Sequence, residues 1–359
     1  MKVVIRMTSS SDIYAQLKRR IRERGLLERQ PAYYSTKILA TAAMLVTSWL
    51  FLLVAHSSEQ VLLQLCAIVY LAFVTTQLAL LGHDSGHRQV FQAPWKNTIL
   101  GLITGNLLTG ISCAYWINKH NQHHNNPNHL DLDPDLDIPI LAFSEADLPR
   151  KGNLIQVFII KYQAYFFFPM LTLTFLDLQC QGICYLLQKR PKNSVLELIL
   201  LGIHFIAYCF TLVTFFGAWK AAVFILVHQA LTGLYMGSIF APNHKGMPVY
   251  DESSRREFFY RQVLTSRNVK SHPLTDFWYG GLNYQIEHHL FPGMPRNNLS
   301  AARHIVMAFC QEQRIPYTEV GFIQSYKEIL QHLHQVSTPL RKRKSGAPAN
   351  EAAPPVGLL

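Results

Sequence analysis

Four stretches of the chain contain no aspartate, glutamate, lysine or arginine, and they restrict the possible folds more than any other feature. They cover residues 38–55, 61–82, 199–219 and 221–243. Each is roughly 20 residues long, the length that an α-helix needs to cross the hydrocarbon core of a bilayer. A buried helix of a soluble protein rarely extends so far without a charge, so the four runs predict four transmembrane helices.

Two further apolar stretches depart from this pattern. Residues 97–118 include several glycines and polar side chains, and residues 162–176 are short and interrupted by Pro169. We interpret both as interfacial or partly inserted helices. The predicted fold is therefore an all-α integral membrane protein with four transmembrane helices plus interfacial helices.

The charged residues support a membrane location and suggest an orientation. Only 15% of the residues are charged, compared with about 25% in ordinary soluble domains. Basic residues cluster at 18–29 and 341–344, whereas the turn at 56–60 has no lysine or arginine. The positive-inside rule therefore places both termini in the cytoplasm. The net charge of +11 then reflects topology and attraction to anionic lipids, and we expect no nucleic-acid binding.

The same features divide the chain into three parts. We expect a basic cytoplasmic N-terminal segment at residues 1–36, a membrane domain at residues 37–336 and a disordered C-terminal tail at residues 337–359. The tail is rich in proline, alanine and basic residues, a composition that buries too little apolar surface to fold.

Histidines gather in three clusters whose members are three or four residues apart. The clusters are His83 and His87; His120, His123 and His124; and Gln285, His288 and His289. Residues at these spacings share one face of a helix. Each cluster can therefore direct its side chains to one point, as metal coordination requires.

The number of histidines indicates more than one metal ion. Seven imidazoles and a glutamine exceed the four ligands of a closed zinc site, and they also exceed one six-coordinate ion with an open position. Two ions are the simpler interpretation, although imidazole suits iron, copper, zinc and nickel alike. If residues 97–118 and 162–176 do not cross the membrane, all clusters lie in a cytoplasmic cap. His244, at the end of the last apolar run, joins them as a candidate eighth imidazole.

The clusters HDSGH, HNQHH and QIEHH resemble the three histidine boxes of the membrane fatty-acid desaturases in order, spacing and relation to the apolar runs. The third box, with Gln285 in its first position and Leu-Phe-Pro after it, is similar to that of front-end desaturases. It is also similar to that of many bacterial acyl-lipid or acyl-CoA desaturases. The resemblance implies an oxidoreductase that uses O2 to introduce a C=C double bond into a fatty acyl chain.

The resemblance also implies a non-haem di-iron centre, with two Fe ions and O2 as co-substrate. The implied ligands are His83, His87, His120, His123, His124, His244, His288 and His289. His244 lies where the family places a further ligand at the end of its last transmembrane helix. Gln285 replaces the commoner histidine and is a poorer ligand, so both direct and water-mediated contact with iron stay open.

Acidic residues are expected near such a site, because neutral imidazoles compensate little of the metal charge. Asp84 and Glu287 lie inside boxes and are our candidates, with simple surface exposure as the alternative. An acidic run follows the second box at Asp131, Asp133, Asp135 and Asp137. It lacks the glycine and terminal glutamate of a calcium loop, so we interpret it as a solvated loop.

Three absences bear on the electron source. The sequence has no dinucleotide-binding glycine fingerprint, no iron–sulfur cysteine spacing and no His-Pro-Gly-Gly signature of a fused cytochrome b5 domain. We therefore expect a separate donor, such as a ferredoxin or another redox protein with its reductase, to dock on the basic cytoplasmic face. The substrate is expected to be an acyl-lipid or acyl-CoA, and the location to be a bacterial plasma membrane.

Two other functions remain compatible with the sequence. A di-iron membrane hydroxylase or ketolase acting on a lipid or hydrocarbon would carry the same boxes, and its product differs from that of a desaturase in mass. A metal transporter is the alternative of another class, although transporters place their ligands near the bilayer midplane, whereas these clusters lie at the ends of the apolar runs.

Overall fold

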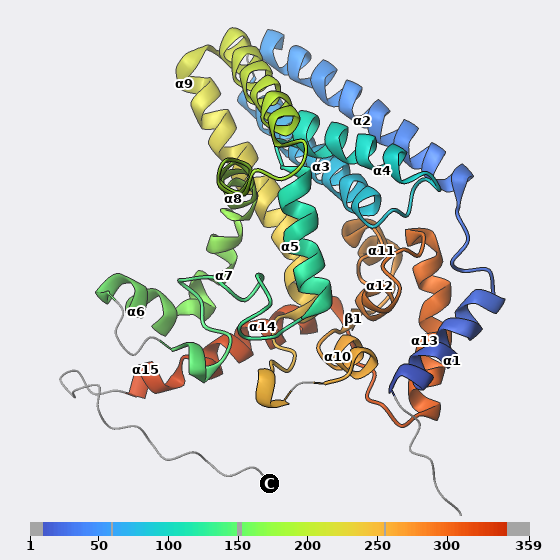
Figure 1. Cartoon of the computed structure of the whole chain (residues 1–359). Coiled ribbons are helices and arrows are strands. Elements are labelled where there is room, and N and C mark those ends of the chain that lie inside the picture. Colours follow the sequence, from blue (N-terminus) through green and yellow to red (C-terminus); the bar gives the residue numbers. More distant parts are fainter. Residues whose placement is uncertain (1–9, 59, 149–152, 255, 343–359) are drawn as a thin grey trace, which may run out of the picture.

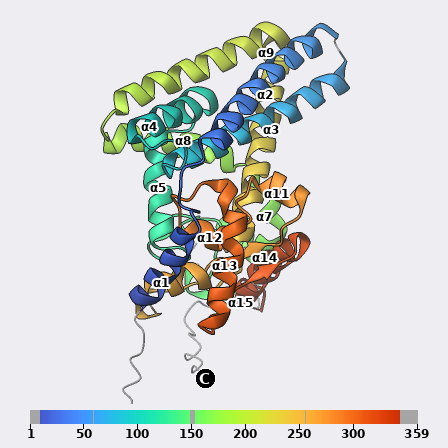
Figure 2. The same ribbon diagram turned by 90° about the vertical axis from the view of Figure 1, so that its right-hand side faces the viewer.

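The computed structural model describes residues 10–58, 60–148, 153–254 and 256–342, and this part of the chain is almost entirely helical (Figure 1). The long apolar helices lie together at one end of the molecule, and most of the short helices lie at the other (Figure 2). The predicted all-α architecture is confirmed.

Two of the predicted spans form a helical hairpin. α2 (Pro31–Ser58) packs along α3 (Val61–Gly86), and α3 also packs against α9 (Ser194–His244). α3 continues beyond the predicted end at residue 82 and carries His83 within its last turn. The first histidine cluster is therefore attached rigidly to an apolar helix.

The other two predicted spans are the arms of α9. The backbone of Gly217 (φ 72, ψ 163) is not helical and separates an arm at residues 194–216 from an arm at 218–244. A positive φ is readily adopted by glycine, so the chain turns there and not at Lys220, where the apolar runs are separated. By length and composition three helices could cross a membrane, namely α2, α3 and α9, or up to five if two bent helix pairs each count as a crossing.

Large apolar side chains cover the outside of these helices. Leu62 on α3 is 74% exposed, and Phe210 and Leu226 on the two arms of α9 are each 70% exposed. A soluble protein rarely exposes so much contiguous apolar surface. This surface, together with the lengths of the helices, identifies an integral membrane protein.

The two ambiguous stretches are bent. Residues 97–118 belong to α4 (Pro94–Gly101), the π-helix η1 (Leu102–Thr109) and α5 (Cys113–Asn125), with a bend of 110° before α5. Residues 162–176 belong to α7 (Gln163–Leu171) and the start of α8 (Thr174–Lys189), and α7 is bent by 96° from α6 (Leu154–Lys161).

Short elements at the other end complete the fold. They are α1 (Ser10–Glu23), α10 (Phe258–Leu264), α11 (Pro273–Tyr279), α12 (Gln285–Leu290), α13 (Leu299–Glu312), α14 (Phe322–Val336), α15 (Thr338–Lys342), and the 3-10 turns η2 (Glu145–Asp147), η3 (Glu252–Ser254) and η4 (Arg296–Asn298). A parallel pair of two-residue strands, β1 (Asn268–Val269) and β2 (Glu319–Val320), links them. An apolar core shared by α1, α10, α12 and α13 fixes α12 in place. Residues 338–342 of the predicted tail are helical, and residues 343–359 lie outside the described part.

Candidate metal centre

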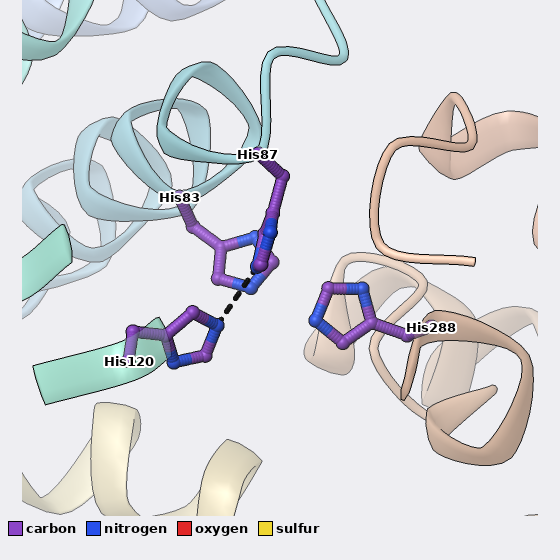
Figure 3. A group of neighbouring side chains, drawn as sticks. All are labelled: His83, His87, His120 and His288. Atoms are coloured by element: carbon purple, nitrogen blue, oxygen red, sulfur yellow. Dashed lines mark hydrogen bonds between the residues drawn. The ribbon is translucent and has the colours of Figure 1, made fainter. Parts of the chain in front are cut away.

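Four histidines from three helices form the first group. α3 and its C-cap supply His83 and His87, α5 supplies His120, and α12 supplies His288. One ring nitrogen from each lies within 4.8 Å of the others. Figure 3 shows the four rings turned toward one space between the helices, with His87 Nε2 2.9 Å from His120 Nε2.

Three histidines form the second group, next to the first. His123 on α5, His244 at the end of α9 and His289 on α12 again place their ligand atoms within 4.8 Å. The Nε2 atom of His244 lies 3.3 Å from that of His123 and 3.0 Å from that of His289. All three side chains are buried.

His124 joins the two groups. Its Nε2 atom is 3.0 Å from His120 Nε2 in the first group, and its ring stacks on that of His289 in the second at 4.1 Å between centroids. The structure thus brings together all eight histidines selected from the sequence. The prediction that each cluster points to one site is wrong for the second and third clusters. α5 and α12 lie between the two groups and contribute side chains to both, His120 and His288 to the first and His123 and His289 to the second.

The chemistry of this arrangement fits metal ions. His83 Nε2, His124 Nδ1 and both ring nitrogens of His288 are buried without a hydrogen-bond partner, which costs free energy unless another ligand satisfies them. Burial lowers the pKa of His288 and of His289 well below the usual value. These two rings are therefore neutral, and neutral imidazole is the form that binds metals. His123 differs, because the Asp133 carboxylate raises its pKa. The groups therefore fit a metal-binding site.

Gln285 lies beside the second group. Its Nε2 atom is 3.0 Å from His244 Nε2, and its Oε1 atom accepts a hydrogen bond of 3.0 Å from Asn243 Nδ2. An amide binds a metal through its oxygen, and here that oxygen accepts one hydrogen bond from Asn243, which leaves its second lone pair free. In this arrangement the amide supports His244.

Asp133 contacts the second group directly. Its carboxylate accepts hydrogen bonds from His123 Nδ1 at 3.0 Å and from the backbone of Asn128 at 2.8 Å, and it is buried. His123 lowers the pKa of Asp133, and Lys119 lowers that of Asp135. The interpretation of the acidic run as a solvated loop is therefore wrong for Asp133. Its position soon after the end of a histidine-bearing helix was the available signal.

The two acidic candidates differ in what they touch. Asp84 Oδ1 is 3.4 Å from His83 Nδ1, and its other oxygen accepts a hydrogen bond of 2.9 Å from Arg296 Nε. Glu287 instead accepts hydrogen bonds from Asn268 Nδ2 and Tyr317 Oη at 2.7 and 2.9 Å, and burial raises its pKa to about 7. Asp84 thus contacts a clustered imidazole, whereas Glu287 attaches α12 to β1.

Two further hydrogen-bond partners of the histidines were not indicated by the sequence. Gln262 on α10 accepts from His289 Nδ1 at 2.9 Å and donates to the backbone oxygen of His124 at 2.8 Å. The backbone oxygen of Thr265 accepts from His244 Nδ1 at 3.1 Å. Such partners fix the tautomer, so that Nε2 is directed to the centre of each group.

Two histidines of α9 lie outside both histidine groups. His228 is hydrogen-bonded to Tyr208 Oη at 2.8 Å and to Thr75 Oγ1 at 3.1 Å, and His204 donates to the backbone oxygen of Leu107 at 3.0 Å. Both are satisfied polar residues.

A small apolar cavity of about 30 Å³ adjoins the first group. His83 and Trp116 lie at its margin, and its walls come from α3, from the arm of α9 at residues 218–244 and from the bend between η1 and α5. The lining residues are Thr76, Ala79, Leu80, Gly82, His83, Gly101, Gly105, Thr109, Ile111, Cys113, Trp116, Met236, Ile239 and Phe240. The lining beside the imidazoles is apolar, and an acyl chain would have to widen this cavity in order to enter it.

Comparison with known proteins agrees with this geometry. The fatty acid desaturase family model matches residues 60–321, which include every clustered histidine. The chain belongs to the fatty acid desaturase family. It is therefore an oxidoreductase, and a fatty acyl chain is the substrate of the family.

The curated relatives that are similar to this chain are named as desaturases. An acyl-lipid (9-3)-desaturase of Physcomitrium patens is 31% identical over 323 residues, covering 87% of this chain and 60% of the moss protein. A Delta(6)-fatty-acid desaturase of Caenorhabditis elegans is 28% identical, covering 92% and 76%, and a Delta(8)-fatty-acid desaturase of Euglena gracilis is 30% identical, covering 87% and 75%. The chain thus spans less than two thirds of the moss relative. These relatives are eukaryotic, which gives no support to the expected bacterial membrane.

Asp133 provides a first prediction for the desaturase. Asp133→Asn removes the negative charge that accepts from His123, and we expect the metal affinity of the second group to fall about 10–100-fold. Titration of purified protein with a chelator, followed by metal analysis, measures this. Asp131→Asn is the matched control, because Asp131 belongs to the same run and is exposed. Equal retention of metal by both variants would contradict the assigned contact.

Proposed function

We propose that this desaturase introduces a C=C double bond into the fatty acyl chain of an acyl-lipid or acyl-CoA at a di-iron centre. The observation that carries the proposal is the pair of histidine groups, joined by His124, beside an apolar cavity. The proposed ligands are His83, His87, His120, His123, His124, His244, His288 and His289. Gln285 would contact iron either directly through its oxygen or through a water molecule, and its amide nitrogen lies 3.0 Å from His244 Nε2.

The stoichiometry defines what the protein must supply. A –CH2–CH2– unit, O2, two electrons and two protons give –CH=CH– and two water molecules, so O2 takes two electrons from the C–H bonds and two from a donor. Bound iron would supply the activation of O2 that no side chain provides. The chain brings the imidazoles together, keeps Asp84 and Asp133 on the outer nitrogens of His83 and His123, and lines the adjoining cavity with apolar side chains.

The topology of the apolar helices supports one orientation. If α2, α3 and the two arms of α9 each cross the membrane, α1, α12 and α14 lie on the same side as the histidine groups. The basic residues of α1 then place that side in the cytoplasm. The protein then has four membrane-spanning helices and a cytoplasmic cap. Both belong to the membrane domain proposed for residues 37–336.

The names of the relatives suggest where the bond is inserted. Delta numbering counts from the carboxyl carbon, and the relatives are named for positions 6 and 8. We infer that this enzyme likewise acts between the carboxyl group and an existing double bond.

A feeding experiment tests the position. A host that expresses the chain is given an 18-carbon acyl chain with its first double bond at carbon 9, and the new bond is located by mass spectrometry. We expect it on the carboxyl side. A new bond on the methyl side would contradict this position, and an acyl chain with 16 added mass units would indicate a hydroxylase.

Electrons must reach the histidines from outside the cavity. α10 offers electrons a short path from the protein surface to the histidines, because its Gln262 contacts both His289 and the backbone of His124. α10 packs against α1, whose exposed side chains include Lys18, Arg19 and Arg22. We infer that an acidic donor, such as a ferredoxin, docks over α1 and α10.

Ionic strength tests this docking surface. Raising the salt concentration from about 0.01 M to 0.3 M shortens the Debye length from about 30 Å to about 6 Å, and we expect turnover at limiting donor to fall several-fold. Arg22→Glu should raise KM for the donor, whereas Lys189→Glu on α8, which also alters an exposed base, should not. Turnover that is insensitive to salt and to Arg22→Glu would exclude the surface.

A further inference from the structure

The bend between η1 and α5 is held by buried polar side chains. We refer to residues 105–116, where the chain turns by 110°, as the elbow. Gly110 has φ 72, and the helical hydrogen-bond ladder is interrupted between Thr109 and Cys113. In an apolar region the backbone groups freed by such an interruption must find other partners.

Glu197 accepts from one freed backbone donor and from the two side chains, Asn106 and Ser112, that accept from the others. It is buried in the first turn of α9, with 3% of its surface exposed. Its carboxylate accepts hydrogen bonds from Ser112 Oγ at 2.7 Å, from the backbone nitrogen of Ala114 at 3.1 Å and from Asn106 Nδ2 at 3.0 Å. The same carboxylate thus contacts both sides of the bend and the N-terminus of α5, where a negative charge is favourable.

The freed acceptors are satisfied from α8 and α9. Gln179 Nε2 donates to the backbone oxygen of Thr109 at 2.9 Å, and His204 Nδ1 donates to that of Leu107 at 3.0 Å. Space at the turn is so limited that a Cβ atom on Gly110 would lie 2.8 Å from Gln179 Nε2 and from the His204 ring. The elbow is therefore fixed on both sides by side chains that belong to other helices.

The elbow is also a wall of the cavity. Gly105, Thr109, Ile111, Cys113 and Trp116 contribute to the lining, opposite α3 and α9. The ring of Trp116 stacks on that of His120 at 4.4 Å, so the same wall contacts the first metal group. A shift of the elbow would therefore move the cavity wall relative to the imidazoles.

We propose that Glu197 is a positioning residue, which fixes the elbow and thereby determines which C–C bond of the acyl chain lies beside the metal ligands. The inference rests on the proposed desaturation. Successive carbons of an extended chain are only about 1.3 Å apart, and displacements of about 1 Å at a reacting centre change rates by up to about 10²-fold. A small relaxation of the elbow should therefore redistribute the product between neighbouring positions.

The charge of Glu197 is essential to this role. A carboxylate accepts at both oxygens, and hydrogen bonds to a charged acceptor are roughly twice as strong as neutral ones. Glu197→Gln retains the size of the side chain but directs an amide N–H group toward donors at Ser112, Ala114 or Asn106. At least one of these contacts becomes repulsive, so the elbow must relax while the rest of α9 keeps its sequence.

Double-bond position in the products is the decisive measurement. Wild type, Glu197→Gln and Glu197→Asp are expressed in a host supplied with one acyl substrate, and the positional isomers are quantified by mass spectrometry of derivatised esters. We expect the fraction of product with the bond at a neighbouring position to rise about tenfold in Glu197→Gln. Glu197→Asp, whose carboxylate is retained but withdrawn from α5, should give a smaller rise in the same direction.

A purely structural role would give a different result. Less product at an unchanged position in both variants, or unchanged product in both, would overturn the proposal. If Glu197→Gln does not accumulate in the membrane, the isomer ratio of Glu197→Asp decides alone. Glu319→Gln is the matched control, because Glu319 is a mostly buried carboxylate bonded to Arg303, remote from the elbow, and its product should keep the wild-type position. Absence of product from the wild type would instead count against the proposed function.

Discussion

Replacing Asp84 with alanine is expected to lower the free energy of unfolding by about 3–5 kcal/mol, because the change leaves a buried charge without its partner. The side chains of Asp84 and Arg296 are 1% and 2% exposed. Arg296 also donates to the backbone oxygen of Gly280 at 2.8 Å, so it connects α3 to the segment between α11 and α12. The loss should be measured by thermal or denaturant unfolding of the protein in detergent.

An exposed ion pair provides the control for this prediction. Arg20 and Glu312 approach to 2.7 Å, but their side chains are 41% and 49% exposed. Glu312→Ala should therefore lower the stability much less than Asp84→Ala does. If Asp84→Ala were as stable as Glu312→Ala, the buried pair would not connect α3 to the segment between α11 and α12.

Replacing His244 with alanine is expected to abolish activity and to remove at least one of two bound irons. His244 contacts His123, His289 and Gln285, so it lies at the centre of the second group. Metal analysis of the purified protein gives the iron content, and product analysis of the host membranes gives the activity.

His228→Ala is the matched variant for His244→Ala. Both imidazoles are buried in the same arm of α9, but His228 is bonded to Tyr208 and Thr75. The His228→Ala protein should retain both irons even if it is less stable than the wild type. Two irons in His244→Ala, or a loss of iron in His228→Ala alone, would show that the ligand set is wrong.

The helices and the histidines were accessible from the sequence because both have a simple periodicity. Runs without charge predicted α2, α3 and the arms of α9, and spacings of three and four residues selected seven imidazoles. The eighth, His244, was selected by its position at the end of the last apolar run. The division of the second box was not foreseen. His120 and His123 occupy different groups, because α5 passes between the two sites and presents successive turns to each.

Contacts between distant segments could not be predicted from local patterns. Asp84 and Arg296 are separated by 212 positions, and Glu197 contacts Ser112 across 85. Each pairing depends on how bent segments pack, and the bend at Gly110 itself requires only one residue with a positive φ. Asp133 differs from its exposed neighbour Asp131 only through the turn that directs it toward His123.

The most direct test of the account is the acyl composition of a host that expresses the wild-type chain or His288→Ala, together with a competent electron donor. The fatty-acid esters are analysed by gas chromatography and mass spectrometry. We expect the wild type to produce an acyl chain two mass units lighter than its precursor, with one new double bond, and His288→Ala to produce none. The same new acyl chain at equal yield in both hosts would contradict catalysis at the histidine centre.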